Sequence, residues 1–291
     1  MKLLKLPGID RAFEVDDDLR ALVGVVVAAG GRPLAVGGSV RDHLLGLAPK
    51  DVDIEVYDVA LDLLERALVA ARFDVHAVGR AFGVLKVGVG ATTFDVAMPR
   101  RESKQGAGHK GFVVESDPTM SAKEAAERRD FTVNAIAWAL VDEKLVDPWD
   151  GASDLASGVL RHVSPAFDED PLRVLRAAQF AARFSFDVAD ETIARCRTLQ
   201  AELATLPVER LWVELEKLCV RGVWPSLGFH VLRATGAIDA LFPELESLAG
   251  CAQEYEWHPE GDVGTHTMLV VDEAASLCRV HELDGAERVR V

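Results

Sequence analysis

The chain has 291 residues, 49% of them hydrophobic, which is enough for one large domain or two to three smaller domains with packed cores. A formal net charge of −15 argues against a protein coated in basic surface for nucleic acid, although basic residues do gather locally, as at Arg100, Arg101, Lys104, His109 and Lys110. The N-terminus contains no long apolar run, which excludes a signal peptide or membrane span there. Four widely spaced cysteines are typical of reduced, mostly buried thiols in a cytosolic protein: Cys196, Cys219, Cys251 and Cys278.

In chain order, the first 140 residues predict a mixed α/β region with a small sheet. Residues 17–30 have a helical pattern that Gly30 and Gly31 close, and Ser39 is the expected N-cap of a helix ending near Gly46. A third helix is expected over about 59–72. Strands are expected at RPLAV, DVDIEVY, FDVHAV, GVLKVGV and TTFDVAM, with a hairpin at Gly90 between the last two.

The remainder of the chain predicts one irregular stretch and then helices. Residues 101–125 are rich in Gly, Lys, Ser and Glu and lack periodicity, which indicates a mobile loop. From about residue 168 the patterns are nearly all helical, as in DEDPLRVLRAAQFAARF, DETIARCRTLQAEL, VERLWVELEKLCV and VGTHTMLVVDEAASLCRV. The final ERVRV looks like the start of another apolar element, so we expect a truncated chain.

The first chemical signal is a pair of carboxylates, Asp51 and Asp53. Residues two apart on a strand face the same side, so these side chains are expected to converge. Like charges this close are costly unless a cation neutralises them, and oxygen ligands suit magnesium. Asp95, on another expected strand, offers a third carboxylate. The alternative is an exposed polar strand face.

The second signal is the strand–turn–helix junction AVGGSVRD. Gly37 and Gly38 allow close approach of backbone to a ligand, and free amides at a helix start favour phosphate oxygens. Ser39 can cap the helix or donate to a phosphate, and Arg41 can pair with a triphosphate. The alternative is an ordinary tight turn. A phosphate cradle shortly before paired carboxylates supplies the parts of a metal-assisted phosphoryl transfer.

The third signal is the run ERRDFTVNAIAW, where Arg129, Asp130 and Asn134 lie together within a helical turn. A ribose and phosphate clamp is the functional interpretation, and a capped helix with surface charges is the alternative.

The fourth signal is DEDPLRVLRAAQF. Asp168 is the expected N-cap and Pro171 suits a first turn. Asp170 and Arg173, three apart with Glu169 beside them, offer an acceptor next to a fork-shaped donor that can read a nucleobase edge. An intrahelical ion pair is the alternative.

With these four segments in order, the chain resembles the class II tRNA nucleotidyltransferase and bacterial poly(A) polymerase family. The resemblance covers roughly residues 33–216, through LAVGGSVRDHLLG, KDVDIEV, RRDFTVNAIAW, DPWDGASDLASGVLRHV, FDEDPLRVLRAAQFAARFSF and VERLWVEL. It implies an α+β fold with a polymerase-β-like head over 1–145, a helical neck over 146–220 and a partial helical body over 221–291. It also implies a magnesium cofactor, a cytoplasmic location and, as partners, the tRNA 3′ end with ATP and CTP.

The resemblance assigns roles to particular residues. Asp51 and Asp53 become the catalytic metal-binding pair, with Asp95 a further metal candidate. The nucleotide-binding residues that it implies are Gly37, Gly38, Ser39, Arg41, Arg129, Asp130, Asn134, Glu169, Asp170, Arg173 and Arg176. Within this set, Asp130 meets the ribose 2′-hydroxyl, Asp170 and Arg173 bond to the base, and Glu169 supports them. Cytosine and adenine place an amine beside a ring-nitrogen acceptor, which an aspartate and an arginine complement.

One feature departs from the family pattern, because Gln179 stands where many members have arginine. The segment EYEWHPEGDVGTHTM resembles the opening of the HD phosphohydrolase domain that is appended to some members, with His266 as its first histidine. The following His-Asp pair and final Asp are absent from this chain, so no phosphohydrolase metal site is expected. The expected activity is addition of CMP and AMP to the tRNA 3′ end; poly(A) synthesis, a CC- or A-only activity and a non-catalytic RNA-binding module are the alternatives.

Overall fold

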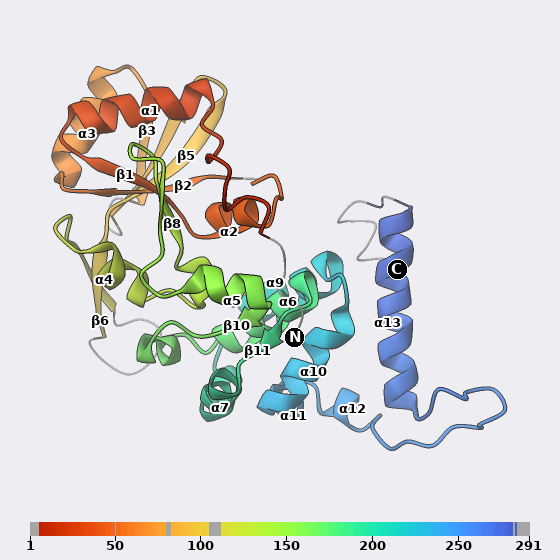
Figure 1. Ribbon diagram of the computed structural model, residues 1–291. Coiled ribbons are helices and arrows are strands. Elements are labelled where there is room, and N and C mark those ends of the chain that lie inside the picture. The colour runs from red at the N-terminus through yellow and green to blue at the C-terminus, as the bar shows by residue number, and fades with distance from the viewer. Residues whose placement is uncertain (1–5, 50, 80–82, 105–111, 282, 284–291) are drawn as a thin grey trace. The chain divides into compact units, whose positions relative to one another are not determined.

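The computed structural model describes residues 6–49, 51–79, 83–104, 112–281 and 283, and places them in two compact units. One unit comprises Lys2–Ala156, here called the head, and the other Ser157–Val291 with Met1, here called the helical unit. Figure 1 shows the head in red to green and the helical unit in green to blue. Among the described residues, no helix is long and apolar enough to cross a membrane.

The head is built on a sheet that has, in its described part, seven strands in the order β3-β4-β5-β2-β1-β8-β9. Strand β1 lies between β2 and β8 and pairs with both in antiparallel fashion, whereas β2 and β5 run parallel. Hairpin β4–β5 turns at Gly90, whose φ is 57°. The strands are β1 (Arg32–Val36), β2 (Asp53–Tyr57), β3 (Asp74–Gly79), β4 (Val84–Val89), β5 (Thr92–Ala97), β8 (Ala137–Ala139) and β9 (Lys144–Val146).

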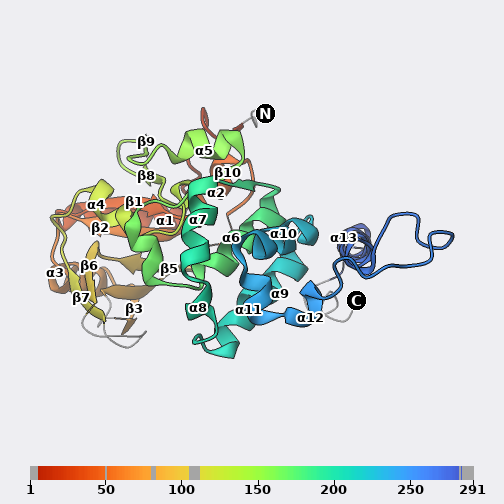
Figure 2. The same ribbon diagram turned by 90° about the horizontal axis from the view of Figure 1, so that it is seen from below.

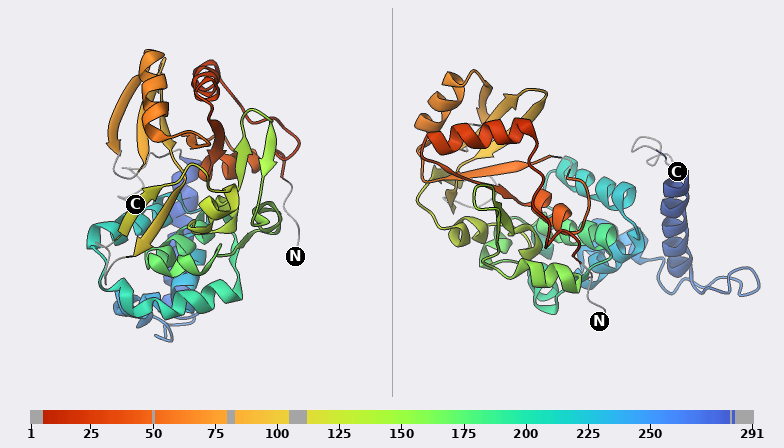
Figure 3. Two further views of the ribbon diagram at one scale, coloured as in Figure 1. Left: turned by 90° about the vertical axis from the view of Figure 1, so that its left-hand side faces the viewer. Right: turned by 45° about the horizontal axis from the view of Figure 1, so that its top comes forward.

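Helices α1 (Asp17–Ala28) and α3 (Leu61–Ala70) lie side by side against this sheet (Figure 1). Their inward residues, among them Leu22, Val26 and Leu64, are fully buried. The second view in Figure 3 brings both helices forward over the strands. Short helix α2 (Gly38–Leu44) instead follows β1 directly and packs against it. The predicted α/β order of the head, and with it the fold class, is confirmed.

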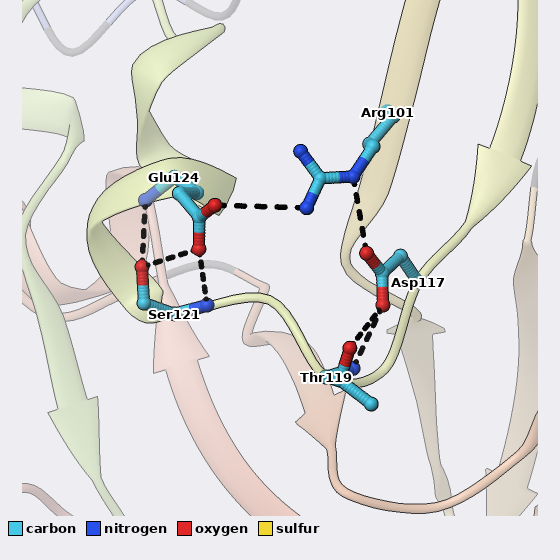
Figure 4. A network of polar contacts seen from close by, with 5 residues as sticks. All are labelled: Arg101, Asp117, Thr119, Ser121 and Glu124. Carbon is cyan, nitrogen blue, oxygen red and sulfur yellow. Dashed lines mark hydrogen bonds and ion pairs between the residues drawn. The ribbon is translucent and has the colours of Figure 1, made fainter.

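The predicted loop without regular structure over 101–125 is wrong for its described part. Strands β6 (Arg100–Lys104) and β7 (Phe112–Ser116) pair, and α4 (Ala122–Glu127) follows. Figure 4 shows the contacts that order this segment: Arg101 donates to Asp117 at 3.0 Å, and Ser121 and Glu124 form a capping box. Residues 105–111, including His109 and Lys110 of the basic cluster, lie outside the described part.

The helical unit centres on α6 (Arg173–Phe184), which packs against α9 (Val208–Arg221) and α10 (Pro225–Thr235) (Figure 2). Helix α6 is amphipathic and buries a run of small and aromatic residues that includes Ala177, Ala178 and Phe180. The other helices are α5 (Gly151–Ser157), which spans the division between the units, α7 (Asp190–Thr198), α8 (Gln200–Leu203), α11 (Ala237–Leu241), α12 (Pro243–Glu246) and α13 (Val263–Val280). A short parallel pair, β10 (Val159–Leu160) with β11 (Asp187–Val188), completes the unit.

Several local predictions need correction. The expected helix over DETIARCRTLQAEL is divided into α7 and α8. Only two of the four cysteines are buried, Cys196 and Cys278, while Cys219 and Cys251 are exposed. Burial raises the pKa of the Cys196 thiol to about 12, which keeps it protonated and unreactive.

Candidate active site

The sheet register places Asp53 at the edge where β1 gives way to the glycine turn. Asp53 is the first residue of β2, opposite Val36 on one side and Asp95 on the other. Asp51 precedes the strand, so the expected strand over DVDIEVY is two residues too long. The alternation of side chains along a strand therefore does not explain how the Asp51 and Asp53 side chains are oriented relative to each other.

Three carboxylates, those of Asp51, Asp53 and Asp95, influence one another electrostatically at this edge of the sheet. Desolvation, and then the negative charges of Asp95 and Asp51, raise the pKa of Asp53, while Arg129 and Lys86 oppose the shift. Lys86 on β4 donates to Asp95 at 2.8 Å, so Asp95 already has a cationic partner. Of the three aspartates, Asp95 is thus the one in a direct ion pair with Lys86.

The donor set of Asp51 and Asp53 fits a hard divalent cation, because both offer oxygen ligands and because desolvation and then neighbouring negative charge raise the pKa of Asp53. The oxygen atoms of Asp51, Asp53 and Asp95 do not all lie within 4.8 Å of one another; across the described residues, the group of three that does comprises His258, Glu260 and His266. Assignment of Asp95 as a third ligand stays a prediction.

Glu55 is a carboxylate of this strand that sequence reasoning missed. It lies two residues after Asp53 on β2, and its side chain is buried. Tyr57 donates to it at 2.6 Å, and Arg128 lies 3.5 Å away. The period-two spacing of Asp53, Glu55 and Tyr57 was visible in the sequence and places all three on one strand face. Glu55 acts structurally, because its charge is satisfied within the head.

The glycine turn after β1 leads directly into α2. Gly37 has a φ of 72°, in the left-handed region, and a Cβ there would lie 3.0 Å from Nη1 of Arg129. The prediction that Ser39 caps the helix is wrong. The N-cap is Gly37, and Ser39 lies inside α2, where it donates to Val36 O at 3.0 Å. The short Gly-Gly link lets α2 begin one residue before Ser39.

A buried hydrogen-bond chain joins this turn to the ERRDFTVN segment. Arg41 donates to Asn134 Oδ1 at 2.6 Å, and Asn134 Nδ2 donates to Asp130 Oδ1 at 2.9 Å. All three side chains are less than 10% exposed. Asp42 also accepts from Arg41, at 2.6 and 2.8 Å. The structure therefore brings together three of the sequence-predicted nucleotide residues, although Arg41 and Asn134 lie 93 positions apart.

Arg129 extends the same cluster, since its Nη1 donates to Asn134 O at 3.4 Å. A separate cavity of about 660 Å³ adjoins Asp51 and is lined by the segment from Arg11 to Leu19 and by Thr92 to Phe94, among others. Its lining includes neither Asp53 nor the glycine turn. Of the two carboxylates, this cavity therefore contacts Asp51.

In the helical unit, the expected base-reading residues lie at the start of α6. The prediction that Asp168 caps this helix is wrong, because Asp168 lies in a 3₁₀ turn, η3 (Pro165–Glu169), and pairs with Arg195 at 2.6 Å. The N-cap of α6 is Leu172. Asp170 Oδ1 accepts from Leu172 N at 3.2 Å, and Arg173 donates to Ala166 O at 2.8 Å.

The ionic partner of Asp170 comes from α9, which the sequence did not indicate. Arg210 Nη2 donates to both oxygens of Asp170, at 3.2 and 3.0 Å. The alternative of an intrahelical ion pair therefore does not describe Asp170, which precedes α6. One turn further along α9, buried Glu214 lies 4.0 Å from Arg176 and accepts from Lys217 at 2.8 Å.

These two α9 residues, spaced four apart in VERLWVEL, contact two sequence-predicted nucleotide residues, Asp170 and Arg176. Their spacing is a helical signal, but their partners lie about forty positions away and could not be read from it. Gln179, the departure from the family pattern, is buried at 3% exposure. A neutral amide there avoids the cost of a buried charge.

Comparison with known proteins gives two family matches. The Poly A polymerase head domain matches residues 34–161, and the probable RNA and SrmB-binding site of polymerase A matches residues 185–248. The chain is 45% identical over 244 residues to the Multifunctional CCA protein of Nitrosococcus oceani and 46% identical over 249 residues to that of Methylobacillus flagellatus. This chain belongs to the tRNA nucleotidyltransferase and poly(A) polymerase family.

Solved members of the family agree with this assignment. The Bacillus stearothermophilus CCA-adding enzyme in complex with CTP is 28% identical, with a TM-score of 0.65 over 80% of this chain and 54% of its own. A tRNA nucleotidyltransferase with a primer tRNA and an ATP analogue is 27% identical, with a TM-score of 0.63 over 86% of this chain and 74% of its own. The two Multifunctional CCA proteins are matched over 83% and 84% of this chain, which spans 58% of each relative's length.

Proposed function

We propose that this chain adds CMP and AMP from CTP and ATP to the 3′ end of tRNA and releases pyrophosphate. The observation that carries the proposal is the register of β1 with β2. It sets Asp53 opposite Val36, the residue that leads into Gly37 and Gly38. A phosphate-binding turn and a metal-binding carboxylate thereby share one edge of the sheet, as nucleotidyl transfer requires.

Asp51 and Asp53 are the residues that would hold magnesium, on the strength of their oxygen donors and of their crowded negative charge. A divalent cation bound there supplies charge neutralisation and lowers the pKa of the attacking hydroxyl. In the transfer itself, the 3′-hydroxyl oxygen bonds to the α-phosphorus as the bond to pyrophosphate breaks. The chain's own part is to hold both reactants in line.

The turn and its buried network bind the phosphates and the sugar. In this proposal, backbone amides after Gly37 and Gly38 donate to phosphate oxygens, together with Ser39 and Arg41. Asp130 is fixed by Asn134 at 2.9 Å and by Phe131 N at 2.8 Å, both on Oδ1. We assign this carboxylate to the 2′-hydroxyl, with Arg129 and Asn134 framing the sugar.

In the helical unit, Asp170 is the acceptor for the exocyclic amine of cytosine or adenine, and Arg173 is the donor to the adjacent ring nitrogen. Uracil and guanine present a carbonyl to the carboxylate, which costs a buried hydrogen bond. Glu169 supports this pair, and Arg176 adds positive charge for the nucleotide. Arg210 holds Asp170 in place and is a positioning residue.

We divide the chain functionally into a head over 1–145, a neck over 146–220 that carries the base-reading residues, and a body over 221–291 that resembles the beginning of an HD-like domain. The reaction takes place in the cytoplasm, where tRNA is its substrate.

The test is incorporation of labelled CTP and ATP into tRNA ending before, within and after its CCA sequence, with an unstructured RNA as a parallel substrate. Addition that stops once CCA is complete supports the proposal. Untemplated runs of A on the unstructured RNA would instead identify a poly(A) polymerase, and addition of C alone or A alone a partial enzyme. Absence of incorporation with every RNA would leave a binding module.

A further inference from the structure

The function proposed above assigns nothing to the cavity of about 660 Å³ in the head. Its lining residues come from three segments of the chain, residues 11–19, 46–52 and 91–94, together with His43. The first of these segments precedes residue 34, where the match to the Poly A polymerase head domain begins. One wall of the cavity is therefore built by residues outside the family match.

Hydrogen bonds hold this N-terminal wall against its neighbours. Nε2 of His43 lies 3.2 Å from Arg11 O, which ties the first segment to α2. Asp18 Oδ2 accepts from Thr92 Oγ1 at 2.9 Å and from Ala91 N at 3.2 Å, which ties the start of α1 to the β4–β5 hairpin. The wall is anchored at both ends, so the cavity is preformed, as binding sites for small molecules usually are.

The cavity lies next to one carboxylate of the proposed catalytic pair. Its lining includes Asp51, whereas Asp53 and the turn of Gly37 and Gly38 lie outside it. The proposed function places the triphosphate at that turn, and the attacking 3′-hydroxyl must approach the α-phosphorus in line with the departing pyrophosphate. A molecule in the cavity can therefore present a hydroxyl group beside Asp51 without displacing the triphosphate.

The charges of the lining argue against a phosphate group as the occupant. Among the described lining residues there is one arginine, Arg11, and there are three carboxylates, those of Glu14, Asp16 and Asp51. A triphosphate is repelled by this excess of negative charge. The ribose and base of a nucleoside are uncharged, and they offer hydroxyl and amine donors to carboxylates. Arg11 is exposed, so it can meet the phosphate that precedes a terminal nucleoside in an RNA chain.

The size and the remaining side chains suit a single nucleoside. A volume of about 660 Å³ lies within the roughly 300–1,000 Å³ that is typical of small-ligand sites. Leu47 and Pro49 offer apolar surface to a base. Thr93 is exposed on β5 and offers a hydroxyl group to the sugar or to the polar edge of the base.

We propose that this cavity binds the 3′-terminal nucleoside of the acceptor RNA, with its 3′-hydroxyl directed toward Asp51. The inference rests on the proposed function and adds to it a binding site for the acceptor, built in part by the segment from Arg11 to Leu19. The triphosphate and the RNA end then occupy different sites of the head, so binding of the RNA can be weakened without weakening binding of the nucleotide.

The first test is steady-state incorporation of CTP into tRNA that ends before CCA. Ala12→Trp and Thr93→Trp fill the cavity from two different segments, each with a large ring at an exposed lining position. Both variants should raise the KM for tRNA by about tenfold or more, the loss of binding expected when one base is displaced. The KM for CTP should stay that of the parent.

Ala28→Trp is the matched control, because Ala28 is exposed on α1 and lies outside the cavity lining. It should react with tRNA and CTP as the parent does. Far-ultraviolet circular dichroism establishes that each variant is folded. Parent values of the KM for tRNA in both filled variants, or a rise in the KM for CTP alone, would overturn the proposal.

Photocrosslinking supplies a readout that does not depend on turnover. A tRNA whose 3′-terminal nucleoside is 4-thiouridine should crosslink to the parent within residues 11–16, 46–49 or 91–94, and this crosslink should be lost in the two filled variants. Crosslinks confined to other segments would contradict the proposed site. If the parent incorporates no nucleotide into any RNA, the proposed function itself is wrong, and the crosslink then decides separately whether the cavity binds an RNA end.

Discussion

The head and the helical unit hold their predicted nucleotide residues in different ways. In the head, Arg41, Asn134 and Asp130 are less than 10% exposed and bond to one another in a chain. In the helical unit, the ion pair of Asp170 with Arg210 is about one third exposed on each side. The group proposed to bind the sugar is therefore fixed inside a core, whereas the group proposed to read the base is held at the surface.

This difference in burial predicts how substitutions in the two groups of residues affect stability. A buried donor that loses its acceptor costs about 1–3 kcal/mol, because water cannot replace the partner. An exposed ion pair contributes about 0–1 kcal/mol, because solvent screens it. Substitutions in the head should therefore alter stability and activity together, and those around Asp170 should alter nucleotide choice with little effect on stability.

The largest expected effect is at the acidic edge. Asp53→Asn should lower kcat for CTP incorporation by about 10³-fold or more, because several kcal/mol of charge stabilisation is lost and each 1.36 kcal/mol is tenfold. Single-turnover incorporation measures this. Asp74→Asn, an exposed carboxylate on β3, is the control and should react as the parent does. Near-normal turnover of Asp53→Asn would remove Asp53 from the catalytic pair.

The same substitution should make the metal-free protein more stable. The pKa of Asp53 is raised above its ordinary value of 3.8, so protonated Asp53 stabilises the fold relative to the ionised form. That stabilisation is complete below pH 3.8 and is lost as the pH rises through the folded-state pKa. Asp53→Asn mimics the protonated form, so it should unfold at a higher temperature than the parent at pH 7 and at a similar one near pH 3. A lower unfolding temperature at pH 7 would contradict the charge crowding.

The next effect concerns base choice. Asp170→Ala removes the acceptor for the amine of C or A and the repulsion against the carbonyl of U or G. The preference for CTP and ATP over UTP and GTP should fall by about 10–100-fold, which corresponds to 1–3 kcal/mol for a mispaired buried edge. Arg173→Ala should weaken CTP and ATP use. Relative kcat/KM for all four nucleotides on one tRNA measures both, and unaltered ratios would refute the base-reading assignment.

The contrast between the units also explains what could be predicted from the sequence. The helical period was sufficient for α1, α3 and α9, because each buries one repeating face. Strands β1 and β2 were also expected, although both are buried along nearly their whole length and the expected β2 began two residues too early. Helix starts were less predictable. Ser39 and Asp168 both have capping side chains, yet Gly37 and Leu172 occupy the cap positions because the glycine turn and the 3₁₀ turn begin their helices elsewhere.

Long-range partners were beyond sequence reasoning. The role of Arg210 depends on α9 packing against α6, and that of Lys86 depends on the β4–β5 register that sets it opposite Asp95. By contrast, the helix in the supposed loop over 101–125 was predictable, since Ser121 and Glu124 have the spacing of a capping box. The amino-acid composition of residues 101–125 suggested a loop, so the capping box of Ser121 and Glu124 was overlooked.

A smaller effect on activity, joined to one on stability, is expected at Asp130. Asp130→Ala leaves Asn134 Nδ2 and Phe131 N without their acceptor, so the free energy of unfolding should fall by about 1–3 kcal/mol. The ratio of kcat/KM for CTP to that for dCTP should fall by about tenfold, as one hydrogen bond of about 1.4 kcal/mol to the 2′-hydroxyl is lost. Equal losses on both nucleotides would make Asp130 a purely structural residue.

The smallest expected effect tests the surface half of the comparison most directly, because the chain contains a matched control. The Arg210–Asp170 pair has side-chain exposures of 39% and 33%, and the Arg233–Glu246 pair has exposures of 39% and 34% in the same unit. Arg210→Ala and Arg233→Ala should therefore cost similarly little stability, about 0.2–1 kcal/mol each.

Only Arg210→Ala should change nucleotide choice, by about two- to fivefold, because Asp170 is then free to turn away from the base and a pair of this kind supplies up to about 1 kcal/mol. Arg210→Lys keeps the charge but replaces the planar guanidinium whose Nη2 donates to both oxygens of Asp170, so it should give an intermediate ratio. The measurements are urea unfolding and relative kcat/KM for the four nucleotides on one tRNA. If Arg233→Ala shifts the ratios as much as Arg210→Ala does, the effect is a general loss of surface charge and Arg210 has no positioning role.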